Sequence, residues 1–253
     1  MNASDEANNI LTKLHEIGLG LEVISGDRVY EGLPIDYRTA ITEMKESNYR
    51  YWKEMEWPAY YISFLLESSL SDSMNVVDED KRVCFEAASI WDVRVKSMGS
   101  NTPWVILTDV QNMNRTINNH NGFGLIIIRA LMNYELKSEV KDYHDELKGG
   151  PSEYSKKILL EGRKPRRRKK VMFLIDAFAY HFQNLEEFRE GIINGWLKDN
   201  VATNWRNSDE SPRNPKYKIN ISRIPEKFKV IRHNFNYDID EFEDEEQEEI
   251  IES

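Results

Sequence analysis

The sequence contains one cysteine, Cys84, and no apolar run long enough to cross a bilayer. A single cysteine excludes an intrachain disulfide, and it also excludes a zinc site built from several cysteines. The first residues lack a basic region followed by an apolar core, so we expect no secretory signal. These absences predict a cytoplasmic protein without a membrane partner.

Several motifs of catalytic chemistry are also missing. The sequence has no glycine-rich loop of the type that cradles phosphates and no serine or cysteine nucleophile motif. Its five histidines show no metal-ligand spacing, so each is expected to be structural. Chemistry in this chain must therefore rest on acidic and basic side chains.

Charge is abundant but segregated. The net charge is −10, yet residues 237–253 hold ten acids and no bases, so the remaining 34 acids and 34 bases balance. The stretch GRKPRRRKK stands out from this neutral body and predicts contacts with phosphate, although a solvated loop is the simpler interpretation. Its candidate DNA-binding residues are Arg163, Lys164, Arg166, Arg167, Arg168, Lys169 and Lys170.

The periodicity of apolar residues predicts an α/β fold with a mixed central sheet flanked by helices. We expect one domain over 1–236, with a helical part to about 75, an α/β core from about 76, and an acidic flexible tail over 237–253. Strands are predicted around 91–96, 104–109, 123–134 and 171–182. Helices are predicted over 35–56, 59–70, 109–121, 136–150, from 152, and over 185–197.

Within the stretch SIWDVRVKS, the six residues from Trp91 to Lys96 alternate strictly between apolar and charged. On a strand, this places Asp92, Arg94 and Lys96 on one face and the apolar residues on the other. A carboxylate can hold a hard divalent cation, and a nearby cation can stabilise charge on a phosphate. By spacing alone, a half-solvated strand is the ordinary interpretation.

A metal site at Asp92 needs a second carboxylate. Glu86 is the nearest in sequence, and Asp78 and Asp80 are alternatives. Arg94 cannot act as a base because arginine is not deprotonated in proteins, whereas Lys96 could supply an amine.

A second acid-x-lysine pattern, which ends at Lys148, precedes two glycines. It is better interpreted as a helix end, where Lys148 complements the helix dipole, and catalysis is not expected there. Lys148 and Ser152 remain candidate phosphate contacts.

Several segments occur in an order that resembles a family of prokaryotic type II restriction endonucleases of the PD-(D/E)XK nuclease superfamily. They are YWKEMEWPAYYISFLLE, WDVRVKSMGSNTPWVILTD, YHDELKGGPSEYSKKI, RKPRRRKK and SPRNPKYKINISRIP. The resemblance covers about residues 37–225 and implies a PD-(D/E)XK restriction-endonuclease-like fold.

The resemblance also assigns roles to residues. It makes Asp92 the metal-binding carboxylate and matches Glu56 to a helix acid that faces the metal in such nucleases. Arg94 departs from the usual lysine, and Lys96 is its natural substitute. The implied activity is Mg²⁺-dependent, sequence-specific hydrolysis of double-stranded DNA by a homodimer, within a restriction-modification system. A cognate methyltransferase would act on the same DNA site without having to bind this chain.

Two other functions stay open. The basic segment fits a non-catalytic nucleic-acid-binding protein, although no helix-turn-helix or RNA-binding pattern is present. The presence of Arg94 where such nucleases have lysine favours a degenerate nuclease fold that serves as an interaction module.

Overall fold

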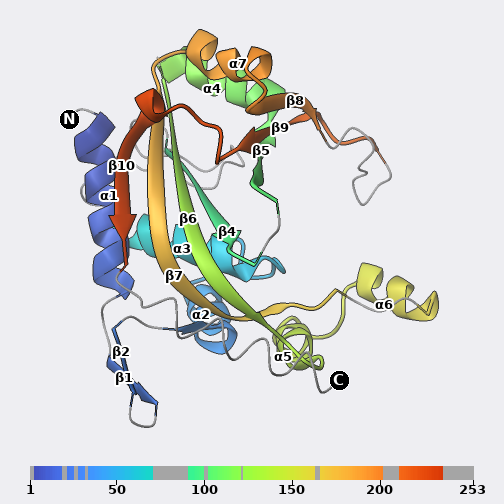
Figure 1. The fold of residues 1–253 in the computed structure, drawn as a ribbon. Helices are drawn as coiled ribbons and strands as arrows, with labels where there is room; N and C mark the ends of the chain where they lie inside the picture. The colour runs from blue at the N-terminus through green and yellow to red at the C-terminus, as the bar shows by residue number, and fades with distance from the viewer. Residues whose placement is uncertain are drawn as a thin grey trace, which may run out of the picture.

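The structure is a computed structural model with a mixed α/β architecture (Figure 1). It describes residues 3–18, 22–25, 28–31, 34–70, 91–99, 102–120, 122–162, 166–201 and 211–235. The predicted class, a mixed sheet flanked by helices, is confirmed. The acidic tail and the residues between 71 and 90, including Glu86, Asp78 and Asp80, lie outside the described residues.

The main sheet is built on two long antiparallel strands, β6 (Phe123–Tyr134) and β7 (Lys169–Phe182). The strand order is β10-β7-β6-β4, where β4 (Trp91–Ser97) runs parallel to β6 and β10 (Lys229–Asn234) runs antiparallel to β7. The short strand β3 (Ile35–Asp36) pairs with the start of β7. Register shifts in the β6–β7 pair accompany the strong curl of these strands in Figure 1.

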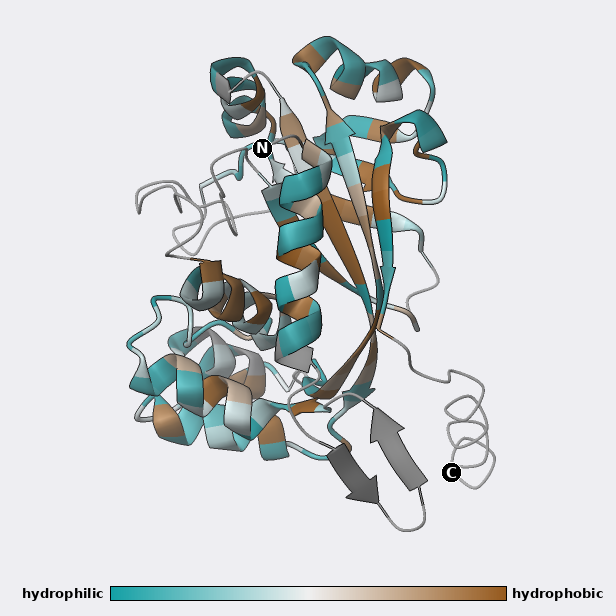
Figure 2. Ribbon diagram, turned by 90° about the vertical axis from the view of Figure 1, so that its left-hand side faces the viewer, coloured by the Kyte–Doolittle hydropathy of each residue, from teal (hydrophilic) through white to brown (hydrophobic). Residues whose placement is uncertain are grey.

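One face of this sheet is covered by helices. Helices α1 (Ala3–Gly18), α2 (Tyr37–Glu46), α3 (Trp57–Leu70) and α5 (Glu139–Leu147) contribute to its core. Ile126 and Ile128 of β6 and Ala177 and Ala179 of β7 supply the sheet side of that core. Figure 2 shows the corresponding hydrophobic strands through the middle of the molecule and the hydrophilic outer residues of the helices.

The other face packs against a smaller, three-stranded sheet at one end of the long strands. Its order is β5 (Trp104–Asp109), β9 (Lys216–Asn220) and β8 (Leu197–Val201), all antiparallel. Helices α4 (Val110–His120) and α7 (Leu185–Ile193), with the short helix η1 (Glu226–Phe228), complete this end. The core between the sheets is aromatic, and its fully buried members include Phe123, Phe182, Phe188, Trp196 and Tyr217.

Two elements lie at the periphery. The hairpin of β1 (Glu22–Ser25) and β2 (Arg28–Glu31) extends at the lower left of the molecule in Figure 1. Helix α6 (Glu153–Leu160) projects at the right of the same view. Among the described residues, no helix is long and apolar enough to span a membrane.

The helix predicted over 35–56 is shorter than expected. It begins at Tyr37, capped by the Asp36 carboxylate, and ends at Glu46. Asn48 has a φ of 53°, and the backbone N–H of Tyr49 donates to the Met44 carbonyl at 2.8 Å. A residue in the left-handed region terminates a helix in this way, and asparagine tolerates that region better than most residues.

Gly124 is a position where an added methyl group has no room. A Cβ built on Gly124 would lie 2.3 Å from the Trp91 ring, which packs across from β4. We expect Gly124→Ala to lower the free energy of unfolding by about 1–3 kcal/mol, because overpacking outweighs the usual gain from replacing glycine. Urea denaturation measures the effect. Gly99→Ala, where no described residue beyond the chain neighbours lies within 4 Å of the new methyl group, should leave the midpoint nearly unchanged.

Candidate active site

The alternation in β4 divides its side chains as the sequence predicts. Trp91, Val93 and Val95 pack into the helix-covered core of the main sheet. Asp92 and Arg94 therefore point to the opposite face, beside Leu125 and Ile127 of β6. The candidate site thus lies on the sheet face that meets the three-stranded sheet, and not on the helix-covered face.

Asp92 is completely buried and is held by Arg94. The Nε and Nη2 atoms of Arg94 both lie 2.9 Å from the same carboxylate oxygen, Oδ2. The other oxygen, Oδ1, has no hydrogen-bond partner among the described residues. Burial raises the pKa of Asp92, and the charge and hydrogen bond of Arg94 oppose that rise.

Lys96 is directed away from Asp92. Its ammonium group donates to the backbone carbonyl of Thr102, in the segment that leads into β5. Burial lowers the pKa of Lys96. The cation that contacts Asp92 is therefore Arg94, and Lys96 belongs to a neighbouring pocket.

The site residues fit a metal ion only in part. Asp92 Oδ1 is an uncompensated buried oxygen, the type of ligand that Mg²⁺ accepts. Within the described ranges, no three His, Cys, Asp or Glu residues are grouped so that they could hold a metal. A second ligand would have to come from outside those ranges, where Glu86, Asp78 and Asp80 lie.

The structure does not bring Glu56 to Asp92. The Glu56 carboxylate pairs with the Lys169 ammonium, and the indole of the adjacent Trp57 donates to the Lys169 carbonyl at 2.8 Å. Lys169 lies opposite Tyr134, nine residues along β6 from the partner of Asp92. At about 3.3 Å per residue this is roughly 30 Å along the strand, too far for a shared metal ion.

The basic segment is divided in the structure. Arg163 and Lys164 lie outside the described residues, while Arg166 and Arg167 are exposed. Arg167 also donates from Nε to the Glu135 carbonyl at 2.9 Å. Within the described part of the segment, Arg166, Arg167 and Lys170 are exposed and are therefore placed to meet a phosphate directly.

The end of the basic segment is engaged within the protein. Arg168 is only 8% exposed, and its backbone N–H donates to the Glu135 carboxylate. Lys169 and Lys170 belong to β7, where Lys169 pairs with Glu56 and Lys170 lies 3.4 Å from Glu139. The burial of Arg168 does not fit the direct DNA contact expected from the sequence.

Lys148 and Ser152 mark helix ends, as predicted. Lys148 caps α5 and is half-buried, and both burial and the nearby Arg168 lower its pKa. Gly149 and Gly150 follow with φ of 83° and 131°. Ser152 caps α6 by accepting from the Ser155 N–H at 3.2 Å. These roles account for both residues without a DNA contact.

His144 is buried between an acceptor and a cation. Its Nε2 lies 2.9 Å from the Trp52 carbonyl, and its Nδ1 lies 3.5 Å from Arg168 Nη1. Because a carbonyl only accepts and a guanidinium only donates, the ring is neutral with its proton on Nε2. Burial, together with Lys148 and Arg168, lowers the pKa of His144 to about 4.

The lowered pKa of His144 predicts that the folded protein loses stability as the pH falls. The unfolded chain binds a proton at His144 as the pH falls below 6.5, and the folded chain binds it only near pH 4. The stabilisation is complete above 6.5 and decreases as the pH falls toward 4, by about 3 kcal/mol in total. Urea unfolding between pH 8 and pH 4.5 should show a smaller loss in His144→Gln than in the unmodified protein. Equal losses in the two proteins would exclude this histidine as the cause.

Sequence reasoning missed a second ion pair with a buried carboxylate on the Asp92 face. The Nε atom of Arg129 in β6 lies 2.5 Å from Asp176 Oδ1 in β7, and its Nη2 pairs with Oδ2. Arg232 Nη2 of β10 lies 3.5 Å from the same carboxylate. The register aligns Lys96, Arg129 and Asp176 across three strands. The available signal was a charged residue flanked by apolar residues on both sides, Arg129 in β6 and Asp176 in β7.

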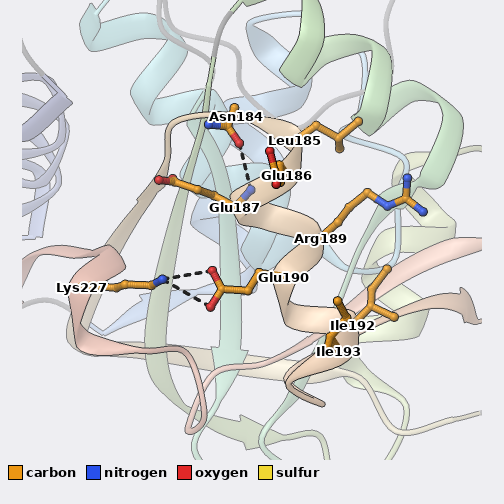
Figure 3. Close-up of a pocket in the computed structure, with 9 residues that line it drawn as sticks. All are labelled: Asn184, Leu185, Glu186, Glu187, Arg189, Glu190, Ile192, Ile193 and Lys227. Atoms are coloured by element: carbon orange, nitrogen blue, oxygen red, sulfur yellow. Dashed lines mark hydrogen bonds and ion pairs between the residues drawn. The ribbon is translucent and has the colours of Figure 1, made fainter.

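A hollow of about 930 Å³, not lined by Asp92, lies against α7 (Figure 3). Three acids, Glu186, Glu187 and Glu190, line it together with Arg189 and Lys227. Lys227 is paired with Glu190 at 3.0 Å. This acidic surface does not suit a polyanion.

No family model matches the chain, and no curated protein or solved structure is significantly similar to it. A function for this chain therefore has to be inferred from its own residues.

Proposed function

We propose that this chain is a Mg²⁺-dependent, sequence-specific endonuclease of double-stranded DNA, a type II restriction enzyme with a PD-(D/E)XK-like site. The observation that carries the proposal is Asp92, a fully buried carboxylate with one oxygen held by Arg94 and the other without a hydrogen-bond partner among the described residues. It lies in the WDVR segment that resembles the nuclease motif, next to a sheet face rich in cations.

The chain's own residues would act as follows. Asp92 would present Oδ1 to a divalent cation, together with a carboxylate from another part of the chain such as Glu86. When bound, that ion would supply an activated water and charge stabilisation at the phosphate. Arg94 would hold the Asp92 carboxylate in place and stabilise negative charge on the phosphate, without acting as a base.

The proposed activity includes a homodimer, because a palindromic DNA site is matched by a two-fold symmetric protein. It also includes a methyltransferase of the same specificity that protects the host DNA. Neither partner is needed for the first test.

The test is digestion of a fully sequenced phage genome with the purified chain, with Mg²⁺ or with EDTA. Discrete fragments that require the metal would support the proposal. DNA that stays intact with Mg²⁺ and Mn²⁺, across several genomes, would contradict it. Calcium titration followed by thermal unfolding provides a second measurement, because an ion at Asp92 should raise the unfolding temperature.

One observation favours a second function. Arg94 already compensates Asp92, and the Asp92–Arg94 pair is consistent with a structural ion pair in a non-catalytic nucleic-acid-binding protein or a degenerate nuclease fold. Such a protein would bind DNA equally well in EDTA and with Mg²⁺, and would not cut it.

A further inference from the structure

A small pocket lies where β4 ends and the three-stranded sheet begins. Its volume is about 310 Å³, and it is lined by two cations, Lys96 and Arg129, by the hydroxyl-bearing residues Ser97, Thr102 and Ser222, and by the apolar residues Met98, Pro103 and Ile221. None of the described residues that line it is acidic. The pocket therefore offers positive charge and hydroxyl groups in a recess of limited size.

The two cations are positioned by the sheet. Lys96 and Arg129 are register partners on the parallel strands β4 and β6, so their side chains leave the same face next to each other. Asp176 fixes Nε and Nη2 of Arg129, and Arg232 lies 3.5 Å from the same acid, so two arginines share one carboxylate. Positive charge exceeds negative charge around the pocket even when Asp176 is counted.

Of the two cations, Lys96 and Arg129, Lys96 has the charge that is less compensated by acidic or polar groups of the described residues. Its ammonium group has three N–H donors, and the acceptor found for it among the described residues is the Thr102 carbonyl. Burial disfavours its charged form. An anion in the pocket would accept the remaining donors and offset that cost.

A basic surface continues from the pocket. The outer face of the three-stranded sheet carries Trp104, which follows the pocket residue Pro103. The ammonium groups of Lys198 and Lys218 lie 4.8 Å and 5.7 Å from the centre of its ring. The indole thus holds two cations on the face turned away from the aromatic core.

We propose that the pocket between β4, β5 and β9 is a phosphate-binding subsite, and that Lys198 and Lys218 extend it along one DNA strand. The proposal deepens the proposed function and rests on it only for the identity of the nucleic acid. Lys96 lies four residues from Asp92 on β4, roughly 13 Å along the strand. A phosphate held at Lys96 is therefore within a few nucleotides of one at Asp92, and it positions the strand without undergoing reaction.

The experiment measures binding of a fluorescent DNA duplex by anisotropy, in EDTA and at several salt concentrations. Lys96→Gln and the double variant Lys198→Gln/Lys218→Gln should each weaken binding about 5- to 10-fold. The slope of log affinity against log salt should become shallower by about one for each phosphate that is no longer bound. The control is Lys227→Gln, which removes the same charge from the acidic hollow of Figure 3 and should not change the affinity.

Affinity and salt dependence that stay unchanged in both Lys96→Gln and the double variant would overturn the proposal. The double variant keeps the test valid if Lys96→Gln fails to fold, because its substitutions lie on the outer face of the small sheet. Inorganic phosphate serves as the second probe. If Lys96→Gln abolishes stabilisation by phosphate but leaves duplex binding intact, the pocket serves a small phosphorylated compound and the DNA track is wrong.

Because the binding assay contains EDTA, its result is independent of cleavage. A chain that binds DNA through this pocket but never cuts it would contradict the nuclease proposal and leave the subsite standing.

Discussion

Replacing Asp92 with asparagine is expected to lower the rate of DNA cleavage by about 10²–10³-fold, the scale on which loss of one charge-stabilising group acts. Asparagine keeps the shape of the side chain but removes the charge that would attract a divalent cation to Oδ1. The rate should be measured at saturating DNA and Mg²⁺. The rise in unfolding temperature caused by Ca²⁺ should disappear in the same variant.

Glu67→Gln is a matched control for this substitution. Glu67 is a partly buried carboxylate whose pKa, like that of the fully buried Asp92, is raised by burial, and it lies 3.7 Å from Arg50 in a different part of the fold. Its replacement should leave cleavage unchanged. If Asp92→Asn cuts DNA at the normal rate with a normal Ca²⁺ effect, the active site lies elsewhere, even if the chain is a nuclease.

The local part of this site could be predicted from the sequence because it depends on one short period. A strand turns alternate side chains to opposite faces, so the pattern around Asp92 placed Trp91 in a core and Arg94 beside the acid. The long apolar strands and the helix that ends before Gly149 followed from equally local signals. Each of these predictions needed only residues within one element.

Interactions between distant segments could not be predicted in the same way. Glu56 resembles a site acid in sequence, but the pairing of β6 with β7 places its partner Lys169 far from Asp92. Arg168 belongs to a run of bases, yet Glu135 and His144 bind it in the interior. Both outcomes depend on strand register and helix packing, which a single sequence does not specify.

The ion pairs that the buried carboxylates of this sheet form with arginines are also relevant to function. Burying a carboxylate is costly, and here the Asp92 and Asp176 carboxylates are buried while the side chains of Arg94 and Arg129 stay 20% and 32% exposed. The same face nevertheless carries both Asp92–Arg94 and Arg129–Asp176. Both arginines therefore combine a buried acidic partner with a solvent-accessible side, the arrangement that the proposed contact with phosphate requires.

Substitutions of the two cations of β4, Arg94 and Lys96, should change different kinetic parameters. Because Arg94 contacts the Asp92 carboxylate at 2.9 Å, Arg94→Gln is expected to lower the cleavage rate at saturating DNA by about 100-fold. Lys96 donates instead to Thr102 and lines the pocket, so Lys96→Gln should weaken DNA binding and leave the saturated rate within about 3-fold of normal. Arg94→Lys, which restores an acid-x-lysine motif, should keep most of the rate.

Arg50→Gln is the control for loss of a guanidinium, because Arg50 is exposed and lies 3.7 Å from Glu67, outside the site. The prediction would be contradicted if Arg94→Gln cut DNA at the normal rate and Lys96→Gln had a lower rate at saturating DNA. In that case Lys96 must move from Thr102 toward Asp92 when DNA binds, and Arg94 would act only as a structural counter-ion of the buried acid. Equal loss of the saturated rate in both variants, with no further loss when the two substitutions are combined, would mean that the two cations act as one unit on the phosphate.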